Sequence, residues 1–358
     1  MSIEPLPNVE RAQVEVGDNH PNMLRRTTRP RVVLVGCGRR FTSALGPVLR
    51  EMGAYPVAVV DPARGARDRV MEVGFSLDRT TVAANMVDLP ALHDIATDAV
   101  IIASPSGLHF EHAMISLSSS IPTFIEKPLA CTSSQARRLR SFGPGSIAGS
   151  EQRIHRADLK LLQWLIESGR IGRLRRIDYL DVMTPAPAII SSWRNDMKLA
   201  GGGVLLDLGY HTVGAIQWLL GTDTSDFAVT YSRLSYGSLQ VEDRVDACWV
   251  SGNVEIWVNI RLSSERPREV LTAKGTLGEL RIERERRGSQ VSTVNIRIAG
   301  RSGVTMRLPL TSTYDTKSLR DFMLGAVDSS QLTRHVQILT LLDQIYARAN
   351  GGSSSSCG

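Results

Sequence analysis

The sequence predicts a doubly wound parallel α/β domain followed by an α+β domain with a large, mostly antiparallel open sheet. Up to about residue 149, short apolar segments alternate with helical stretches, which is typical of a parallel sheet. After Gln152, a few helices are followed by a run of strand-like segments. A glycine turn, Gly36–Cys37–Gly38, separates the first apolar run from the first helical stretch.

The first half of the chain supplies the elements of the parallel sheet. Val32–Val35 is a continuous apolar run, as expected for a strand that is buried on both faces. Residues 42–52 can form the helix that follows it. Further strands are expected at Pro56–Val60, Ala99–Ala103 and Thr123–Ile125.

The second half supplies the antiparallel sheet and its helices. Helices are expected at 157–168, 203–220, 316–327 and 332–349. Strands are expected at 174–183, 226–235, 241–251, 253–263, 267–273, 278–284, 291–298 and 303–308. We therefore divide the chain into an N-terminal arm (1–29), a dinucleotide-binding domain (30–149), an α+β domain (150–350) for substrate binding and oligomerisation, and a flexible tail (351–358).

Composition excludes several classes of protein. The apolar fraction of 42% and the charged fraction of 22% are ordinary for a globular protein. The net charge of +6 comes mostly from scattered arginines, with no basic run among aromatic residues, so we expect no nucleic-acid partner. No apolar run is long enough to span a bilayer. The four cysteines match neither a zinc site nor a disulfide framework, which favours a cytoplasmic protein without a metal.

The glycine turn predicts a nicotinamide dinucleotide site. Gly36 and Gly38 allow a tight turn and a close approach of the backbone to a pyrophosphate. Asp61 ends the second strand, where a carboxylate can bind ribose hydroxyls and would repel a 2′-phosphate, so NAD is favoured. NADP stays possible because three nearby arginines could bind that phosphate: Arg39, Arg40 and Arg64.

Two further strand ends lie on the same ligand-binding edge. Ser104–Pro105 follows one strand and His109 lies just beyond it, either beside the cofactor or as a structural cap. Glu126–Lys127–Pro128 follows the next strand, and Glu126 and Lys127 are expected to contact the cofactor. A lysine in this place can donate a hydrogen bond to a reacting oxygen or take part in proton transfer.

A second constellation follows the triple glycine at 201–203. Asp207 and His211 are four residues apart on the predicted helix and share one face. A carboxylate beside an imidazole can orient it and stabilise its charged form, as a general acid or base requires.

Together these motifs resemble the Gfo/Idh/MocA oxidoreductase family over about residues 31–345. The resemblance also rests on Gln152–Arg153, Trp193–Arg194 and Lys274–Gly278. It implies a Rossmann domain followed by an α+β domain whose open sheet is often used for oligomerisation. It also implies that Lys127, Asp207 and His211 meet the substrate carbon at the nicotinamide. Substrate-pocket positions of the family fall on Arg153, Trp193 and Arg194.

Two positions depart from the family pattern. Phe41 stands where the glycine motif has a third small residue, and Gly214 stands where many members have a further aspartate. The first bears on how the cofactor is placed. The second bears on the identity of the substrate.

The sequence therefore predicts an enzyme that transfers a hydride between NAD and an alcohol carbon of a sugar, amino sugar or cyclitol. Lys127 would hold the substrate oxygen, and His211, oriented by Asp207, would take the hydroxyl proton. An alternative is an NADPH-dependent ketoreductase of a nucleotide-linked sugar, with Tyr210 or Lys127 as the acid. A second alternative is a non-catalytic dinucleotide-binding sensor.

The open sheet of the second domain is expected to expose an apolar face, which predicts a homodimer or homotetramer.

Overall fold

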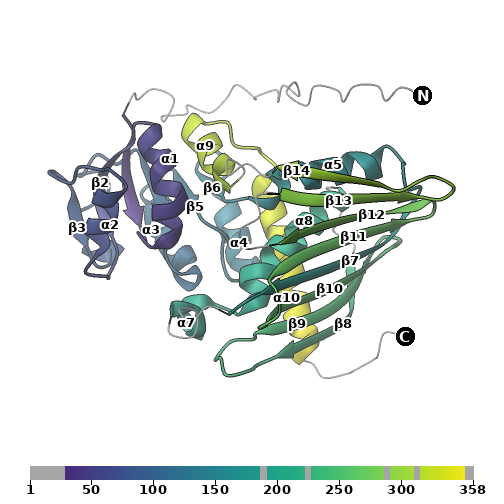
Figure 1. The fold of residues 1–358 in the computed structure, drawn as a ribbon. Coiled ribbons are helices and arrows are strands. Elements are labelled where there is room, and N and C mark those ends of the chain that lie inside the picture. The colour runs from purple at the N-terminus through teal and green to yellow at the C-terminus, as the bar shows by residue number, and fades with distance from the viewer. Residues whose placement is uncertain (1–28, 186–191, 222–226, 286–290, 310–314, 351–358) are drawn as a thin grey trace.

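The computed structural model describes residues 29–185, 192–221, 227–285, 291–309 and 315–350, which form two sheets with helices between them (Figure 1). The predicted N-terminal arm, except Arg29, and the predicted tail lie outside these ranges. Within them, no helix has both the length and the apolar character needed to cross a membrane.

The first sheet is parallel throughout its described strands, in the order β3-β2-β1-β4-β5-β6. Its strands are β1 (Arg31–Val35), β2 (Tyr55–Val60), β3 (Thr81–Ala83), β4 (Ala99–Ile102), β5 (Thr123–Ile125) and β6 (Ile147–Gly149). Val32–Val35 are at most 1% exposed, because helices cover both faces of the sheet. The doubly wound prediction is confirmed. Strand order reverses between β1 and β4, which is where such sheets bind ligands.

Short helices connect these strands. They are α1 (Gly46–Glu51), α2 (Ala66–Glu72), α3 (His109–Ser118) and α4 (Ser133–Arg140). The predicted helix at 42–52 begins as a π-helical turn, Phe41–Leu45, and continues as α1. Phe41 is buried against Phe75, with ring centroids 6.3 Å apart. The bulky residue at the third position of the glycine motif thus fills the core.

The second sheet has eight described strands in the order β14-β13-β12-β11-β7-β10-β9-β8. They are β7 (Leu174–Met183), β8 (Phe227–Ser235), β9 (Arg244–Ser251), β10 (Val254–Leu262), β11 (Arg268–Gly275), β12 (Gly278–Glu285), β13 (Val291–Ile298) and β14 (Val304–Pro309). Neighbouring strands are antiparallel except for β7 and β10. The prediction of a mostly antiparallel sheet is confirmed.

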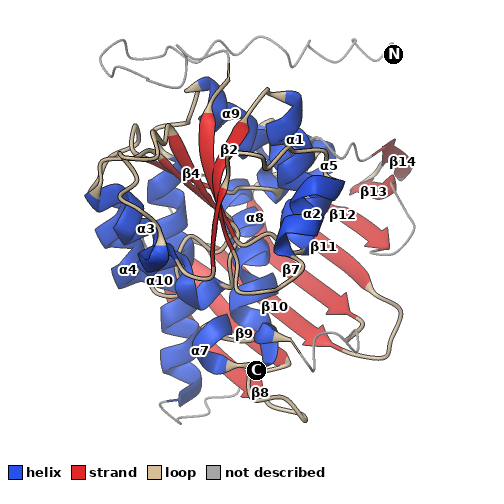
Figure 2. Ribbon diagram, turned by 90° about the vertical axis from the view of Figure 1, so that its left-hand side faces the viewer, coloured by secondary structure: helices blue, strands red, loops and turns tan. Residues whose placement is uncertain are grey.

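Helices cover one face of this sheet (Figures 1 and 2). Those that contact it are α5 (Ala157–Glu167), α8 (Tyr210–Leu220) and α10 (Gln331–Asn350). The described residues of the second half also form α7 (Met197–Ala200) and α9 (Lys317–Leu324). A helix was expected over 203–220, but Leu205–Gly209 form a π-helical turn and the α-helix begins at Tyr210. Helix α10 lies against both α4 and β8 and so joins the two halves of the molecule.

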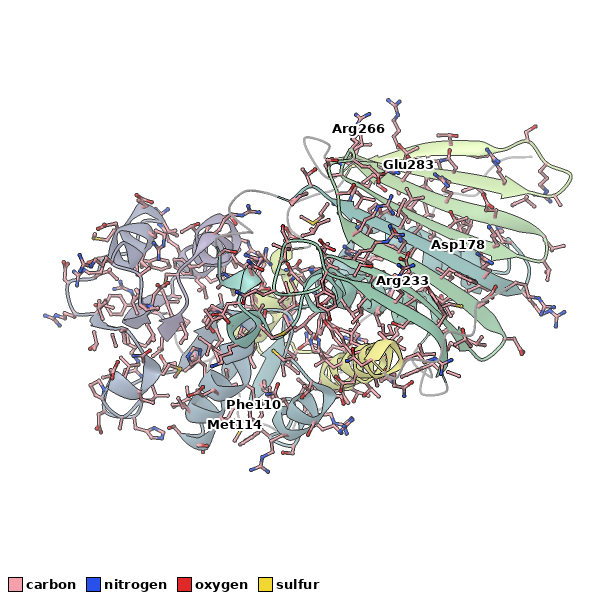
Figure 3. The ribbon with its side chains drawn as sticks, turned by 90° about the horizontal axis from the view of Figure 1, so that it is seen from below. Phe110, Met114, Asp178, Arg233, Arg266 and Glu283 are labelled. Atoms are coloured by element: carbon pink, nitrogen blue, oxygen red, sulfur yellow. The ribbon has the colours of Figure 1, made fainter. Side chains whose placement is uncertain are left out.

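The other face of the second sheet is polar rather than apolar. It carries salt bridges from Lys274 to Asp178, from Arg176 to Glu255 and from Arg244 to Asp246. Figure 3 shows Asp178 and Arg233 on this sheet, apart from Phe110 and Met114 of α3. The expected large apolar face is therefore wrong, because the side chains that alternate with the buried ones are mostly charged.

Candidate active site

The turn after β1 is open toward the ligand-binding edge. Gly36 has φ +82°, and its N–H donates to the Val60 carbonyl at 2.8 Å. A Cβ on Gly36 would lie 2.4 Å from the Ser104 nitrogen, so only glycine fits there. A Cβ on Gly38 would meet no atom within 4 Å. This combination of a tight turn and open space fits a pyrophosphate lying against the backbone.

Asp61 joins the end of β2 to the glycine turn. Its Oδ2 accepts the Cys37 N–H at 2.7 Å, and its Oδ1 accepts the Ala63 N–H at 2.8 Å. Arg69 donates through Nε to the Cys37 carbonyl at 2.6 Å and pairs with Asp61 at 3.4 Å. Sequence reasoning missed Arg69, since an arginine within a helix carries no motif. Asp61 is thus held at the site expected for the adenosine ribose.

The three arginines near the turn have different surroundings. Arg39 and Arg64 are exposed. Arg40 instead donates through Nε to the Glu126 carboxylate at 2.6 Å and through Nη2 to the Asp315 carbonyl at 2.7 Å. Arg40 therefore links the glycine turn to the loop of Lys127, and a 2′-phosphate would have to compete with these acceptors.

The Ser104–Pro105 segment is held by two histidines. The ring nitrogens of His109 lie 2.8 Å from the Ser104 carbonyl and 2.7 Å from the Pro128 carbonyl. Ser104 Oγ lies 3.0 Å from His112 Nδ1. Burial lowers the pKa of His109, although both backbone carbonyls oppose that effect. His109 thus joins two loops of the site, which favours the structural alternative, and its contact with the cofactor stays a prediction.

Lys127 follows β5 and points at Asp207. Its Nζ donates to Asp207 Oδ1 at 2.6 Å and to the Asp207 carbonyl at 2.9 Å. The preceding Glu126 is buried and accepts hydrogen bonds from Arg40, Ser150 and the Lys127 N–H. The peptide bond to Pro128 is cis. The predicted lysine and carboxylate meet, although 80 residues separate them.

Asp207 lies between two cations. Its Oδ2 pairs with Arg194 Nε at 3.4 Å, opposite the Lys127 contact. Burial would raise the pKa of Asp207, but Lys127 and Arg194 outweigh it and hold this pKa well below its usual range. Asp207 therefore stays ionised, and the Lys127 ammonium is held in one place.

His211 has different surroundings from those that we expected. It lines a small hollow with Gln152, Arg153 and Gln217, whereas Asp207 lines a separate hollow with Trp193 and Arg194. Both carboxylate oxygens of Asp207 bind cations. The physical reason is that Lys127 and Arg194 bring full charges to this carboxylate. These contacts favour a role of Asp207 in holding Lys127, while the orientation of His211 by Asp207 stays a prediction.

The expected substrate residues also separate. Arg153 is buried, and its guanidinium binds the Asp181 carboxylate at 2.7 Å, Tyr179 Oη at 2.6 Å and Thr212 Oγ1 at 3.2 Å. These partners fix Arg153 where it borders the hollow of His211, and its contact with the substrate stays a prediction. In contrast, Arg194 stacks on Trp193 at 4.3 Å from the ring centroid, beside the Asp207 hollow.

Two hydrogen-bonded pairs were not predicted. Tyr210 Oη lies 2.5 Å from His335 Nδ1, and both residues are at most 3% exposed. This burial leaves no support for Tyr210 as the acid of the alternative ketoreductase. Glu242 accepts the Tyr346 hydroxyl at 2.7 Å. The described residues contain no group of three or more His, Cys, Asp or Glu that could hold a metal ion.

Comparisons with known proteins place this geometry in context. Residues 30–142 match the family described as "Oxidoreductase family, NAD-binding Rossmann fold", and residues 159–303 match the GFO/IDH/MocA C-terminal domain. Rhizopine catabolism protein MocA of Rhizobium meliloti is 26% identical over 58% of this chain and 63% of its own length. Inositol 2-dehydrogenase of Ralstonia nicotianae is 27% identical over 68% of this chain and 71% of its own length. The chain spans about half to two thirds of the first relatives that it matches.

Solved structures share the fold. A 3-ketoreductase from Actinomadura kijaniata, in complex with NADP and TDP-benzene, is 20% identical with a TM-score of 0.76, over 89% of this chain and 98% of its own. The WlbA dehydrogenase from Bordetella pertussis, in complex with NADH and UDP-GlcNAcA, is 20% identical with a TM-score of 0.74. This match covers 91% of this chain and 98% of the dehydrogenase. The two family matches, over residues 30–142 and 159–303, follow each other along the chain in the expected order. The chain therefore belongs to the Gfo/Idh/MocA family of oxidoreductases.

Proposed function

We propose that the chain is an NAD(P)-dependent oxidoreductase of a hydroxyl-bearing carbon in a sugar, amino sugar or cyclitol. The observation that carries the proposal is the Lys127–Asp207 pair at the carboxyl edge of the parallel sheet, the edge that also bears the open glycine turn. A bound nicotinamide supplies the acceptor or donor of the hydride.

The residues of the chain would position the substrate and move its proton. The Lys127 ammonium, fixed by two oxygens of Asp207, can donate to the substrate oxygen and stabilise negative charge that develops on it. His211 remains our proposed group for taking the hydroxyl proton. Trp193 and Arg194 border the hollow at Asp207 and would contact the remainder of the substrate.

We favour NAD over NADP because of Asp61. Its carboxylate is held at the end of β2 by backbone N–H groups, and it would repel a 2′-phosphate. The exposed Arg39 and Arg64 are the groups that would reverse this preference. Calorimetry with NADH and NADPH tests the choice. Binding of neither cofactor would contradict the proposed activity, and a clear preference for NADPH would contradict the argument from Asp61.

A nucleotide-linked sugar is the second candidate substrate. The stack of Arg194 on Trp193 favours it, since a guanidinium and an indole can bind a diphosphate and a base. Solved relatives with TDP-benzene and UDP-GlcNAcA support the same class. A panel of free sugars, cyclitols and nucleotide sugars, followed by absorbance of the reduced nicotinamide, separates free from nucleotide-linked substrates.

We further propose a cytoplasmic homodimer or homotetramer. The spacing of the cysteines is the reason for the location.

A further inference from the structure

Glu242 is a buried acid that sequence reasoning did not select. It lies in the loop between β8 and β9 and is 1% exposed. Its carboxylate accepts the Gly203 N–H at 2.9 Å, the Leu205 N–H at 3.1 Å and the Tyr346 hydroxyl at 2.7 Å. Two of these donors belong to the start of the helical segment that carries Asp207 and His211. A carboxylate here is stabilised by backbone N–H groups that point out of the helix.

A short chain of hydrogen bonds runs from Glu242 to Lys127. The Gly203 N–H donates to Glu242, and the Gly203 carbonyl accepts the Asp207 N–H at 3.0 Å. Asp207 in turn accepts two hydrogen bonds from Lys127 through its carboxylate and its carbonyl. The position of the first helical turn therefore decides where the Lys127 ammonium lies.

The triple glycine is explained by the same contacts. A Cβ on Gly203 would lie 2.0 Å from the Glu242 carbonyl oxygen, and one on Gly202 would lie 2.5 Å from the Tyr346 hydroxyl. The Glu242 carbonyl also accepts the Val204 N–H at 2.9 Å. Side chains at 202 and 203 would push this turn away from Glu242 and Tyr346. The glycines thus let the helical turn lie close to Glu242 and Tyr346, and the Glu242 carboxylate then holds the turn there by hydrogen bonds.

We propose that Glu242 is a positioning residue of the active site, which, with Tyr346, fixes the turn that presents Asp207 to Lys127. This inference rests on the proposed role of Lys127. Burial raises the pKa of Glu242, against the opposing effect of the Tyr346 hydroxyl and the two backbone N–H groups. The N–H groups of Gly203 and Leu205 bring the positive end of the helical segment to this carboxylate.

Acylation of Lys127 tests the proposal without a substrate. The full chain is treated with acetic anhydride, and modification of Lys127 is followed by mass spectrometry in the wild type, E242Q and D243N. In E242Q the N–H₂ group of the amide would face one of the backbone N–H groups, which removes a hydrogen bond and shifts the helical turn at 203–205. Lys127 should then react with acetic anhydride about threefold to tenfold faster. D243N is the matched control, because Asp243 accepts the Gly237 N–H and does not bind the helical turn. D207N sets the upper limit of the effect.

Kinetics and a second variant complete the test. With a substrate in hand, E242Q should lower kcat and leave the affinity for NADH unchanged, whereas D243N should change neither. If E242Q does not fold, Y346F removes one donor only and should give a smaller increase in the same acylation rate. Unchanged acylation in a folded E242Q, or in Y346F where E242Q does not fold, overturns the proposal. Faster acylation in a protein that turns over no substrate would overturn the proposed enzyme activity and leave the positioning of Lys127 in place.

Discussion

At the scale of single residues, the candidate site depends on a lysine held by one aspartate. Lys127 contacts both a side-chain and a main-chain oxygen of Asp207, so rotation of either side chain would break the arrangement. Arg194 adds a second cation on the far side of the carboxylate. Because the pKa of Asp207 is lowered, this pairing should persist from neutral pH well into the acidic range.

The pair should behave as one unit in kinetics. Lys127→Ala and Asp207→Asn should each lower the rate of hydride transfer by about two to four orders of magnitude. The double variant should be little worse than Lys127→Ala, because Asp207 acts through the lysine. Single-turnover transfer measures the rate, and NADH titration should show little change in any variant.

His211→Ala provides the comparison. If His211 is the proton acceptor, its loss should slow transfer by a similar factor and add to the effect of Asp207→Asn. Near-normal transfer in His211→Ala, together with a collapse in Lys127→Ala, would assign the proton transfer to the lysine.

Gly36 gives a second prediction at this scale. Alanine there would adopt φ +82°, at a cost of at least about 1 kcal/mol, and its Cβ would overlap the backbone at Ser104. Gly36→Ala should lower the melting temperature and abolish NADH binding. Gly38→Ala has room for its methyl group, so it should melt as the wild type does and only weaken NADH binding. Equal melting temperatures of Gly36→Ala and wild type would contradict this account of the turn.

At the scale of elements, helix α10 connects the parts of the site. Side chains of this 20-residue helix contact three positions of the first half and the beginning of the second, together with Tyr210 and Glu242 beside the helical segment of the site. These contacts are Gln331 with the Gly149 N–H, Arg334 with Glu151, His335 with Tyr210, Asp343 with the Ser133 N–H, and Tyr346 with Glu242. The helix thus fixes α8 and the turn at 203–205 relative to the first sheet.

Sequence patterns predicted elements better than contacts between them. The strand at 174–183 was placed at its observed bounds, because alternation of buried and exposed side chains is strong along it. The three-residue strands β3 and β6 were missed because so short a run has no period, while the equally short β5 was predicted from its place before Glu126–Lys127–Pro128. Lys127 and Asp207 stand in recognisable motifs. Arg69, Glu242 and Tyr346 stand in no recognisable motif. Their roles depend on contacts between residues far apart in the sequence, up to 104 positions for Glu242 and Tyr346.

The buried histidine of α10 predicts a dependence of stability on pH. Burial lowers the pKa of His335 to about 4, while the unfolded chain titrates near the ordinary value of 6.5. Between these values the unfolded state binds the extra proton, so the free energy of unfolding should fall as pH falls from about 6.5 to 4. For His335 alone the loss from pH 7 to pH 5 is about 2 kcal/mol.

Urea unfolding at pH 7 and pH 5 measures this loss. His335→Gln should reduce the difference between the two pH values, although the variant is less stable overall because its contact with Tyr210 is weakened. The half-buried His112 and His155 also have pKa values lowered to about 4, mainly by desolvation, so a smaller pH effect should remain. An unchanged pH dependence in His335→Gln would show that this histidine is not the responsible group.

At the scale of the whole molecule, the two halves share their cores. Leu319, Phe322 and Met323 of α9 lie in one hydrophobic cluster with strands of the first sheet, and Phe322 lies 5.8 Å from Phe124 between ring centroids. The C-terminal helices therefore cover the sheet that the N-terminal half forms. A chain truncated before α9 would expose this cluster and lose the α10 contacts to the active site.

The open face of the second sheet leads to a prediction about assembly. It surrounds a broad depression of about 880 Å³, with Trp257 and Tyr231 among charged side chains such as Arg233 and Arg281. Aromatic residues within a charged rim are common in protein interfaces. Because both signs of charge are present, two copies can pair opposite charges across the face. We expect a dimer or tetramer whose stability depends on salt.

Light scattering should therefore give a mass above that of one chain in low salt, and a decreasing mass as salt rises from about 0.05 M to about 0.5 M and screens the charges. The double variant Arg233→Glu/Arg281→Glu should be monomeric throughout, since it places like charges where the second copy offers carboxylates. Arg67→Glu is the matched control, because this exposed arginine lies on α2, away from the sheet. A monomeric mass of the wild type in low salt would contradict the predicted assembly. Association that neither salt nor the double variant changes would place the interface on another surface.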